Sequence, residues 1–119
     1  MKARIAAIVL DAADLEVESA FWAGLLDGEV ERLERHHVIR AAGQPILGIQ
    51  HAPSHVPPRW PDGEPQQIHL DLVVDDIRSA HEEVMAAGAT YLSRESEPDA
   101  QSGFWVYADP AGHPFCLCW

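Results

Sequence analysis

The strongest constraint on this chain is an order of predicted elements that occurs twice. In the first half, a β-branched run precedes an amphipathic helical pattern and three strand-like segments, at residues 5–10, 15–26, 29–34, 37–41 and 46–51. In the second half the same order returns, at residues 68–74, 77–87, 90–94, 104–107 and 115–119. Two half-size copies of one pattern predict an α+β fold of two tandem βαβββ modules, whose curved sheets surround a cleft.

Residues at the helix ends support these boundaries. Asp14 precedes the first helical pattern, and Asp75 or Asp76 precedes the second, as N-cap residues do. Gly28 and Gly88 follow the two patterns, where a C-terminal glycine is expected. Both helices therefore have predicted starts and ends.

A proline-rich segment separates the two copies. The chain has nine prolines, and five of them fall between residues 53 and 65, which excludes regular structure there. We predict one domain over residues 1–119, with modules at 1–52 and 67–119 joined by a linker at 53–66. Trp60 lies in this linker, where it either packs the linker down or closes over a pocket; the first is favoured.

Composition excludes several kinds of partner. With 8 Lys and Arg against 19 Asp and Glu, the net charge is −11, so nucleic acid and anionic membranes would be repelled. No run of about 18 apolar residues is present to span a membrane, and the N-terminus lacks a signal-peptide pattern. We expect a cytoplasmic protein, in which Cys116 and Cys118, two apart on one strand, remain reduced thiols.

Alternation in the second half predicts which side chains face the cleft. Apolar residues at 68, 70, 72 and 74 would lie beneath the helix, which leaves His69 and Asp71 on the opposite, concave face. Cys116 and Cys118 share one strand parity and would also face the cleft. The sequence therefore predicts a polar group of side chains on the concave side of the second sheet.

The chain resembles a known superfamily over its entire length. The matching residues are the first helix from Asp14-Leu15 to Leu25-Leu26, the strand 67–76 with His69-Leu70-Asp71, and the ending 109–118, Asp-Pro-Ala-Gly-His-Pro-Phe-Cys-Leu-Cys. With the βαβββ repeat, they resemble the vicinal oxygen chelate superfamily of glyoxalases, bleomycin-resistance proteins and extradiol dioxygenases. The resemblance is particularly close to small glyoxalase-like proteins of actinomycetes, and it implies a homodimer.

The resemblance also implies where a metal would be held. Metal-dependent members place one ligand on the first and one on the last strand of each module, and these positions correspond here to Ala7, Gln50, His69 and Cys116. Only His69 is a good ligand, and Cys116 is a weak candidate. The ligand set for glyoxalase I chemistry is incomplete, so a divalent metal is not favoured.

Each candidate residue has two interpretations. His69 is either a metal ligand or general base, or a polar cavity residue bonded to Asp71 or water, and the second is favoured. Cys116 and Cys118 either form a soft Zn²⁺ site with His69 or are inert thiols, and again the second is favoured. Gln50 is a candidate hydrogen-bonding residue of the cleft, opposite its symmetry mate Cys116. The remaining histidines are expected at the surface or at strand edges: His36, His37, His51, His55, His81 and His113.

Three functions follow from these residues. The first is a small-molecule-binding protein, metal-free or weakly metal-binding, similar to the bleomycin-resistance branch; the acidic charge and the four tryptophans favour a cationic or aromatic ligand. Its predicted cleft residues are Gln50, Trp60, His69, Asp71, Cys116 and Cys118. The alternative is a metal-dependent lyase, isomerase or dioxygenase that uses His69. The third is an accessory domain with a vestigial pocket.

Overall fold

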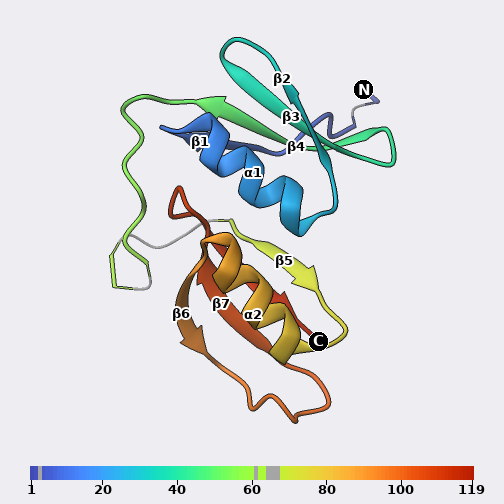
Figure 1. Cartoon of the computed structure of the whole chain (residues 1–119), viewed down its shortest axis with the longest axis vertical. Helices are drawn as coiled ribbons and strands as arrows, with labels where there is room; N and C mark the ends of the chain where they lie inside the picture. Colours follow the sequence, from blue (N-terminus) through green and yellow to red (C-terminus); the bar gives the residue numbers. More distant parts are fainter. Residues whose placement is uncertain (3, 61, 64–67) are drawn as a thin grey trace. The chain divides into compact units, whose positions relative to one another are not determined.

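The computed structural model describes residues 1–2, 4–60, 62–63 and 68–119, and these form two units, Met1–His55 and Val56–Trp119 (Figure 1). The division falls inside the segment predicted as a linker. The predicted boundary between linker and second module, at residues 66 and 67, lies outside the described residues. No helix of the described residues has the length and apolar character needed to cross a membrane.

The first unit contains one helix and one four-stranded sheet. Its elements are β1 (Val9–Ala12), α1 (Leu15–Leu25), β2 (Glu29–Arg32), β3 (His36–Ala41) and β4 (Gln44–His51). The strand order is β1-β4-β3-β2, with β1 parallel to β4 and the other neighbours antiparallel.

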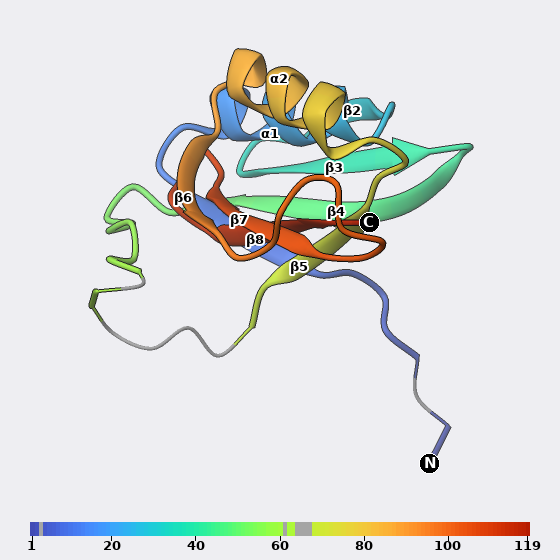
Figure 2. The same cartoon turned by 90° about the horizontal axis from the view of Figure 1, so that it is seen from below.

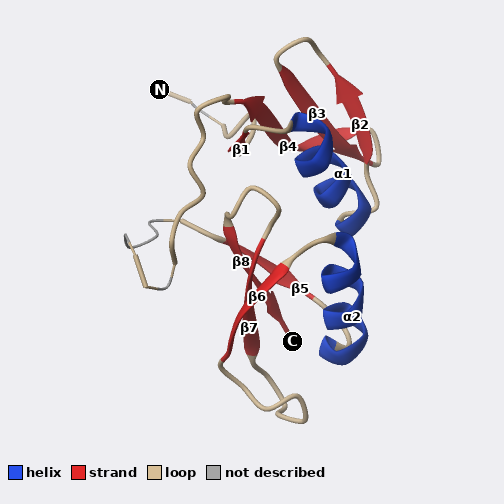
Figure 3. Ribbon diagram, turned by 60° about the vertical axis from the view of Figure 1, so that its left-hand side comes forward, coloured by secondary structure: helices blue, strands red, loops and turns tan. Residues whose placement is uncertain are grey.

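The second unit repeats this arrangement element by element. It contains β5 (Leu70–Val73), α2 (Ile77–Ala87), β6 (Thr90–Arg94), β7 (Phe104–Ala108) and β8 (Pro114–Cys118). The strand order is β5-β8-β7-β6, and β5 runs parallel to β8 (Figure 3). The predicted α+β fold of two βαβββ modules is confirmed.

Capping explains where the helices begin and end. The Asp14 carboxylate accepts a hydrogen bond from Val17 N, and the Asp76 carboxylate accepts one from Arg78 N. Gly88 ends α2 in the left-handed conformation, with φ of 113°, as predicted. Gly28 does not end α1, because Asp27 takes the left-handed conformation instead.

Each helix covers one face of its own sheet. In the first unit α1 buries Phe21 and Trp22 against β3 and β4, where Ile39 and Ile49 are fully buried. In the second unit α2 lies over the sheet (Figure 2), and the core contains Tyr107, Phe115 and Leu117 from the strands and Ile77 and Val84 from the helix. Burying one such side chain contributes about 1.5–3 kcal/mol, so this layer holds each unit together.

The first strand of each unit begins later than its apolar run predicts. β1 starts at Val9 rather than at residue 5, and Ile5 is exposed. Ile68, predicted to lie beneath α2, precedes β5 and is 73% exposed, so that prediction is wrong. Both strands lie at the edge of their sheet, where a strand has one neighbour and the chain can leave the sheet without losing a second ladder.

Candidate functional site

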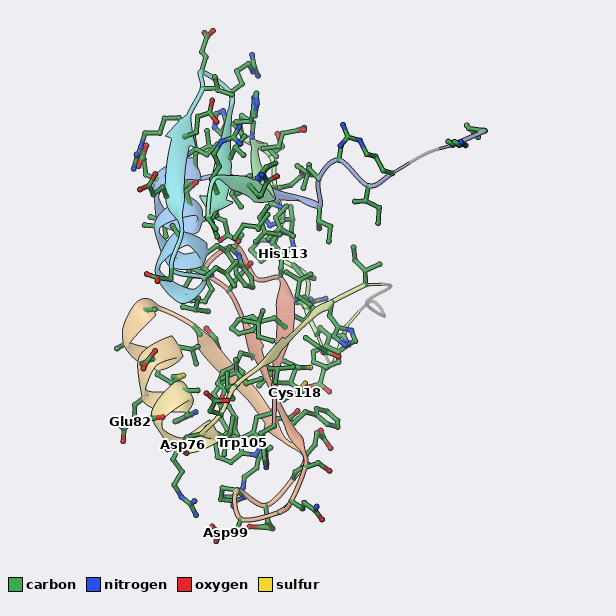
Figure 4. All side chains as sticks on the ribbon, turned by 90° about the vertical axis from the view of Figure 1, so that its right-hand side faces the viewer. Asp76, Glu82, Asp99, Trp105, His113 and Cys118 are labelled. Atoms are coloured by element: carbon green, nitrogen blue, oxygen red, sulfur yellow. The ribbon has the colours of Figure 1, made fainter. Side chains whose placement is uncertain are left out.

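The second sheet carries its polar side chains on the face opposite α2. β5 and β8 run in register, so that Asp71 is paired with Cys116, which is also paired with Val106 of β7. Because alternate residues of a strand point to opposite faces, Phe115 and Leu117 lie in the core under α2, and Cys116 and Cys118 lie on the other side. Figure 4 labels Cys118 on β8 and Trp105 on the adjacent β7.

A cavity of about 360 Å³ lies on this face. It brings together five predicted cleft residues, Trp60, His69, Asp71, Cys116 and Cys118. The cavity is also lined by Phe104, Val106 and Pro114, which were not among the predicted cleft residues. Phe104 and Val106 could have been found, because they alternate with the buried Trp105 and therefore share the face of Cys116 and Cys118. Most of the lining is apolar, and the polar groups come from β5, β8 and the residue before β5.

His69 and Asp71 form a pair at this cavity. His69 Nε2 lies 3.2 Å from Asp71 Oδ1, and about half of each side chain is exposed. The two residues are separated by one position, so they share a strand face and their side chains meet. The structure thus places His69 beside Asp71, one of the two partners expected for it, and the carboxylate remains accessible.

The two thiols are neutral groups. Burial raises the pKa of Cys116 to about 12, and the charge of Asp71 together with a hydrogen bond to Asp71 adds to this effect. Burial and the Asp71 charge also raise the pKa of Cys118. Both cysteines are free, and as protonated thiols they are poor nucleophiles.

The donor atoms of His69, Asp71 and Cys116 all lie within 4.8 Å of one another. Ligand atoms of a tetrahedral zinc ion are separated by about 3.3–3.7 Å, and His69 Nε2 and Asp71 Oδ1, at 3.2 Å, are already near this spacing. A nitrogen, oxygen and sulfur set fits Zn²⁺ rather than Mg²⁺ or Mn²⁺, which prefer oxygen. Binding would also require the Cys116 thiol to lose its proton, which its raised pKa opposes.

Gln50 lies in the first unit and does not line this cavity. It lines a cavity of about 460 Å³ on the corresponding face of the first sheet, together with Ala7, Val9 and Gly48. The capping residues Asp14 and Asp76 are 62 positions apart, which makes Val9 the counterpart of Asp71.

Val9 is paired with Gly48, just as Asp71 is paired with Cys116. The symmetry mate of Cys116 is therefore Gly48, and the prediction that Gln50 occupies this position is wrong. In the first unit, Ala7 corresponds to His69 and Gly48 corresponds to Cys116. Neither Ala7 nor Gly48 has a side-chain atom that could bind a metal.

Two of the histidines predicted at the surface or at strand edges are more buried than expected. His37 is 4% exposed, and its Nδ1 lies 2.7 Å from Ser19 Oγ. His81 is half-buried, and its Nδ1 lies 2.9 Å from the hydroxyl oxygen of Tyr107. The signal for His81 was its helical spacing, because it lies on the stripe of Ile77 and Val84 that faces the sheet.

Comparison with known proteins gives a family match and many structural matches. A family model of the glyoxalase-like domain matches residues 7–118. The fosfomycin resistance protein FosX from Listeria monocytogenes has a similar fold, with a TM-score of 0.71, 18% identity, and coverage of 99% of this chain and 93% of that one.

Two further solved structures share the fold. For FosX from Mesorhizobium loti the TM-score is 0.70, with 16% identity and coverage of 99% of this chain and 92% of that one. For a glyoxalase family protein from Enterococcus faecalis the TM-score is 0.72, with 15% identity and coverage of 98% of this chain and 97% of that one. None of the curated proteins searched matches the sequence.

Proposed function

Because the chain belongs to the glyoxalase-like domain family of the vicinal oxygen chelate superfamily, we propose that it binds a small organic molecule in the cavity of its second unit, without needing a metal. The observation that carries this proposal is the cavity of about 360 Å³, in which mostly apolar walls surround the accessible carboxylate of Asp71. Ligand pockets commonly have about this size and this balance of apolar and polar groups.

The lining defines the class of ligand. Trp60, Phe104 and Val106 offer an apolar surface to an aromatic or branched body. Asp71 is the charged acceptor of the cavity, and the neighbouring thiols of Cys116 and Cys118 are neutral. A ligand with an aromatic body and a cationic end therefore complements the cavity, with its cation beside Asp71 and His69.

Three probes of similar size test this charge preference. We expect 2-phenylethylammonium to bind more tightly than neutral 2-phenylethanol, and 3-phenylpropionate to bind most weakly, as measured by calorimetry. An ion pair at a half-exposed carboxylate contributes about 1 kcal/mol, so Asp71→Asn should weaken binding of the cation about fivefold and leave the alcohol unchanged.

The matched control is Asp75→Asn, because Asp75 is exposed, lies just beyond β5 and does not line the cavity. The control should bind all three probes as the wild type does. Equal affinities for the three probes, or equal effects of the two substitutions, would contradict the proposed ligand class.

A metal-dependent lyase, isomerase or dioxygenase is a second candidate, favoured by the mutual proximity of His69, Asp71 and Cys116. A FosX structure from Listeria monocytogenes was solved with Mn(II) and a sulfate ion. In this chain the three residues would hold the ion, which would polarise a bound oxygen of the substrate.

Elemental analysis of protein purified without a chelator or histidine tag tests this candidate. One bound ion per chain, lost in His69→Ala and kept in His36→Ala, would move the enzyme ahead of the metal-free binding protein. Protein that binds no ion at this cluster, and whose melting temperature does not respond to Zn²⁺, Ni²⁺, Mn²⁺ or Fe²⁺, would exclude it.

Association into a homodimer is part of the proposal. Val73 on the edge strand β5 is 85% exposed, and Val9 on the edge strand β1 is also exposed. Apolar residues on an unpaired edge favour contact with another chain. Light scattering should give the mass of two chains, and a monomer at all concentrations would contradict the proposed dimer.

The free thiols of Cys116 and Cys118 support a reducing compartment such as the cytoplasm.

A further inference from the structure

A short segment before β5 reaches the cavity that contains His69. Residues 56–60, which we call the strap, begin the second unit, and the last of them, Trp60, lines the cavity. Trp60 and Pro58 are half-buried, and the other three residues are exposed. The structure shows no backbone hydrogen bond between the strap and any other described residue. Packing is therefore what holds the strap in place.

Two consecutive prolines make the strap stiff. Pro57 and Pro58 each fix φ near about −65° and have no backbone N–H group, and a proline also restricts the residue before it. Such a sequence favours an extended backbone with few alternatives. The place where the two prolines pack therefore also determines the place of Trp60, which follows two residues after Pro58.

The prolines pack on the turn between β7 and β8, at Gly112. A Cβ on Gly112 would lie 2.7 Å from Pro57 Cβ, 3.2 Å from Pro57 Cα and 3.3 Å from Pro58 Cδ. Carbon atoms in contact are normally about 3.5–4.0 Å apart, so any side chain at position 112 would collide with the strap. Gly112 also has a φ of 92°, which residues with a side chain rarely adopt.

Hydrogen bonds fix the turn on which the strap packs. Gly112 N donates to Asp109 O at 2.9 Å, and His113 N donates to the buried Asp109 carboxylate at 2.8 Å. Figure 4 labels His113 in this turn. β8 begins directly afterwards at Pro114, which lines the cavity together with Trp60. The hairpin that contacts the strap thus also forms part of the cavity wall.

We propose that Gly112 docks the strap on the second unit and thereby positions Trp60 as the wall of the cavity that an aromatic ligand contacts. Gly112 does not line the cavity, so it is a positioning residue that acts through Trp60. Docking orders the indole ring before the ligand arrives, which reduces the ordering that binding requires. The part played by the ligand in this inference rests on the ligand class proposed above.

Calorimetry with 2-phenylethylammonium tests the effect on binding. Gly112→Ala should weaken binding about three- to tenfold, which is the loss expected when one aromatic contact is removed. Trp60→Ala should weaken binding by a similar factor. Because Gly112 acts through Trp60, the double variant should bind the probe no more weakly than Trp60→Ala alone.

Limited trypsin digestion tests the docking without any ligand. Arg59 lies in the strap and is exposed, so cleavage after Arg59 reports how often the strap leaves the turn. Cleavage after Arg78, within α2, requires the helix to unfold and serves as the internal reference. Gly112→Ala should raise the ratio of the two cleavage rates at least about fivefold. Pro57→Gly, which removes the docking contact and keeps the turn, should raise it as well.

Gly88→Ala and Pro53→Gly are the matched controls. Gly88 also has a positive φ, of 113°, but the nearest atom to a Cβ there is Pro110 Cγ at 4.0 Å, so alanine brings the backbone strain without a collision. Pro53 is exposed and precedes the strap, in the first unit. Both controls should keep the wild-type affinity for the probe and the wild-type ratio of cleavage rates.

The proposal is overturned if Gly112→Ala and Gly88→Ala give the same ratio of cleavage rates, or if the effects of Gly112→Ala and Trp60→Ala on probe affinity are additive. A wild-type chain that binds none of the three probes would contradict the proposed ligand class. The docking of the strap by Gly112 would then be decided by the trypsin digestion alone, so the two failures are distinguishable.

Discussion

Asp71 and Cys116 lie opposite each other on β5 and β8, and the Cys116 thiol donates a hydrogen bond to the Asp71 carboxylate. The same carboxylate lies 3.2 Å from His69 Nε2. The Asp71 carboxylate thus lies beside both an imidazole and a thiol, and its negative charge opposes ionisation of the sulfur. This relationship favours the protonated thiol, which is a poor nucleophile.

Alkylation should reveal the protonated state of Cys116. With a pKa of about 12, only a small fraction is thiolate at pH 8, so iodoacetamide should modify Cys116 far more slowly in the folded chain than in urea. Asp71→Asn removes the nearby charge and should raise the folded-state rate, while burial still keeps the pKa above its ordinary value. Mass spectrometry of time points measures the rate. Rapid modification of the folded wild type at pH 8 would contradict the assignment.

The same thiol should make stability depend on alkaline pH. The folded-state pKa of Cys116 is raised above its unfolded value of about 9, so well below pH 9 the proton is bound in both states. Between about pH 9 and pH 12 the unfolded chain releases the proton first, and the free energy of unfolding therefore falls as pH rises. Tyr91 and Tyr107, whose pKa values burial also raises, add to this fall.

Urea denaturation at pH 8 and pH 10.5 isolates the contribution of Cys116. Cys116→Ala keeps both tyrosines, so it should lose less stability between these two pH values than the wild type does. Equal losses in the two proteins would show that the pKa of Cys116 is the same in the folded and the unfolded chain, which would contradict its raised folded-state value.

Most of the fold could be predicted because its signals are local. Asp14, Asp76 and Gly88 mark helix ends through backbone hydrogen bonds and a left-handed φ, and a sequence shows such residues directly. The starts of β1 and β5 could not be predicted. Ile5 and Ile68 have the β-branched character of a strand but no partner strand. Pairing depends on residues 39 positions away for β1 and 45 positions away for β5.

The candidate site was predictable where one strand determined it. Because successive side chains of a strand point to opposite faces, residues two apart share a face. This applies to His69 and Asp71, and to Cys116 and Cys118. The counterpart of Cys116 in the first unit could not be predicted, because identifying it requires the register between two strands. The register places Gly48, and not Gln50, at the position that corresponds to Cys116. Register is a long-range property that the repeat alone does not specify.

Two glycines near α1 should respond in opposite directions to alanine. A Cβ on Gly28 would lie 2.9 Å from Arg40 O and 3.0 Å from Ile39 Cγ2, so backbone or core must shift. Gly28→Ala should lower the free energy of unfolding by about 1–3 kcal/mol. Gly24 lies within α1 with nothing within 4 Å of a Cβ, so Gly24→Ala should raise it by up to about 1 kcal/mol. Urea titration measures both changes, and the same sign for both would refute this assignment.

His81 should contribute to stability through Tyr107. The Tyr107 hydroxyl is fully buried and lies 2.9 Å from His81 Nδ1, and the ring of His81 also packs edge-on against Trp105 at a centroid distance of 5.5 Å. Tyr107→Phe should therefore lower the free energy of unfolding by about 1 kcal/mol, because it removes one buried hydrogen bond. Tyr91→Phe, at the partly exposed neighbouring ring, is the control and should have a smaller effect. In a double-mutant cycle with His81→Phe, the effects of the two changes should be non-additive, whereas strict additivity would mean that the hydrogen bond does not stabilise the fold.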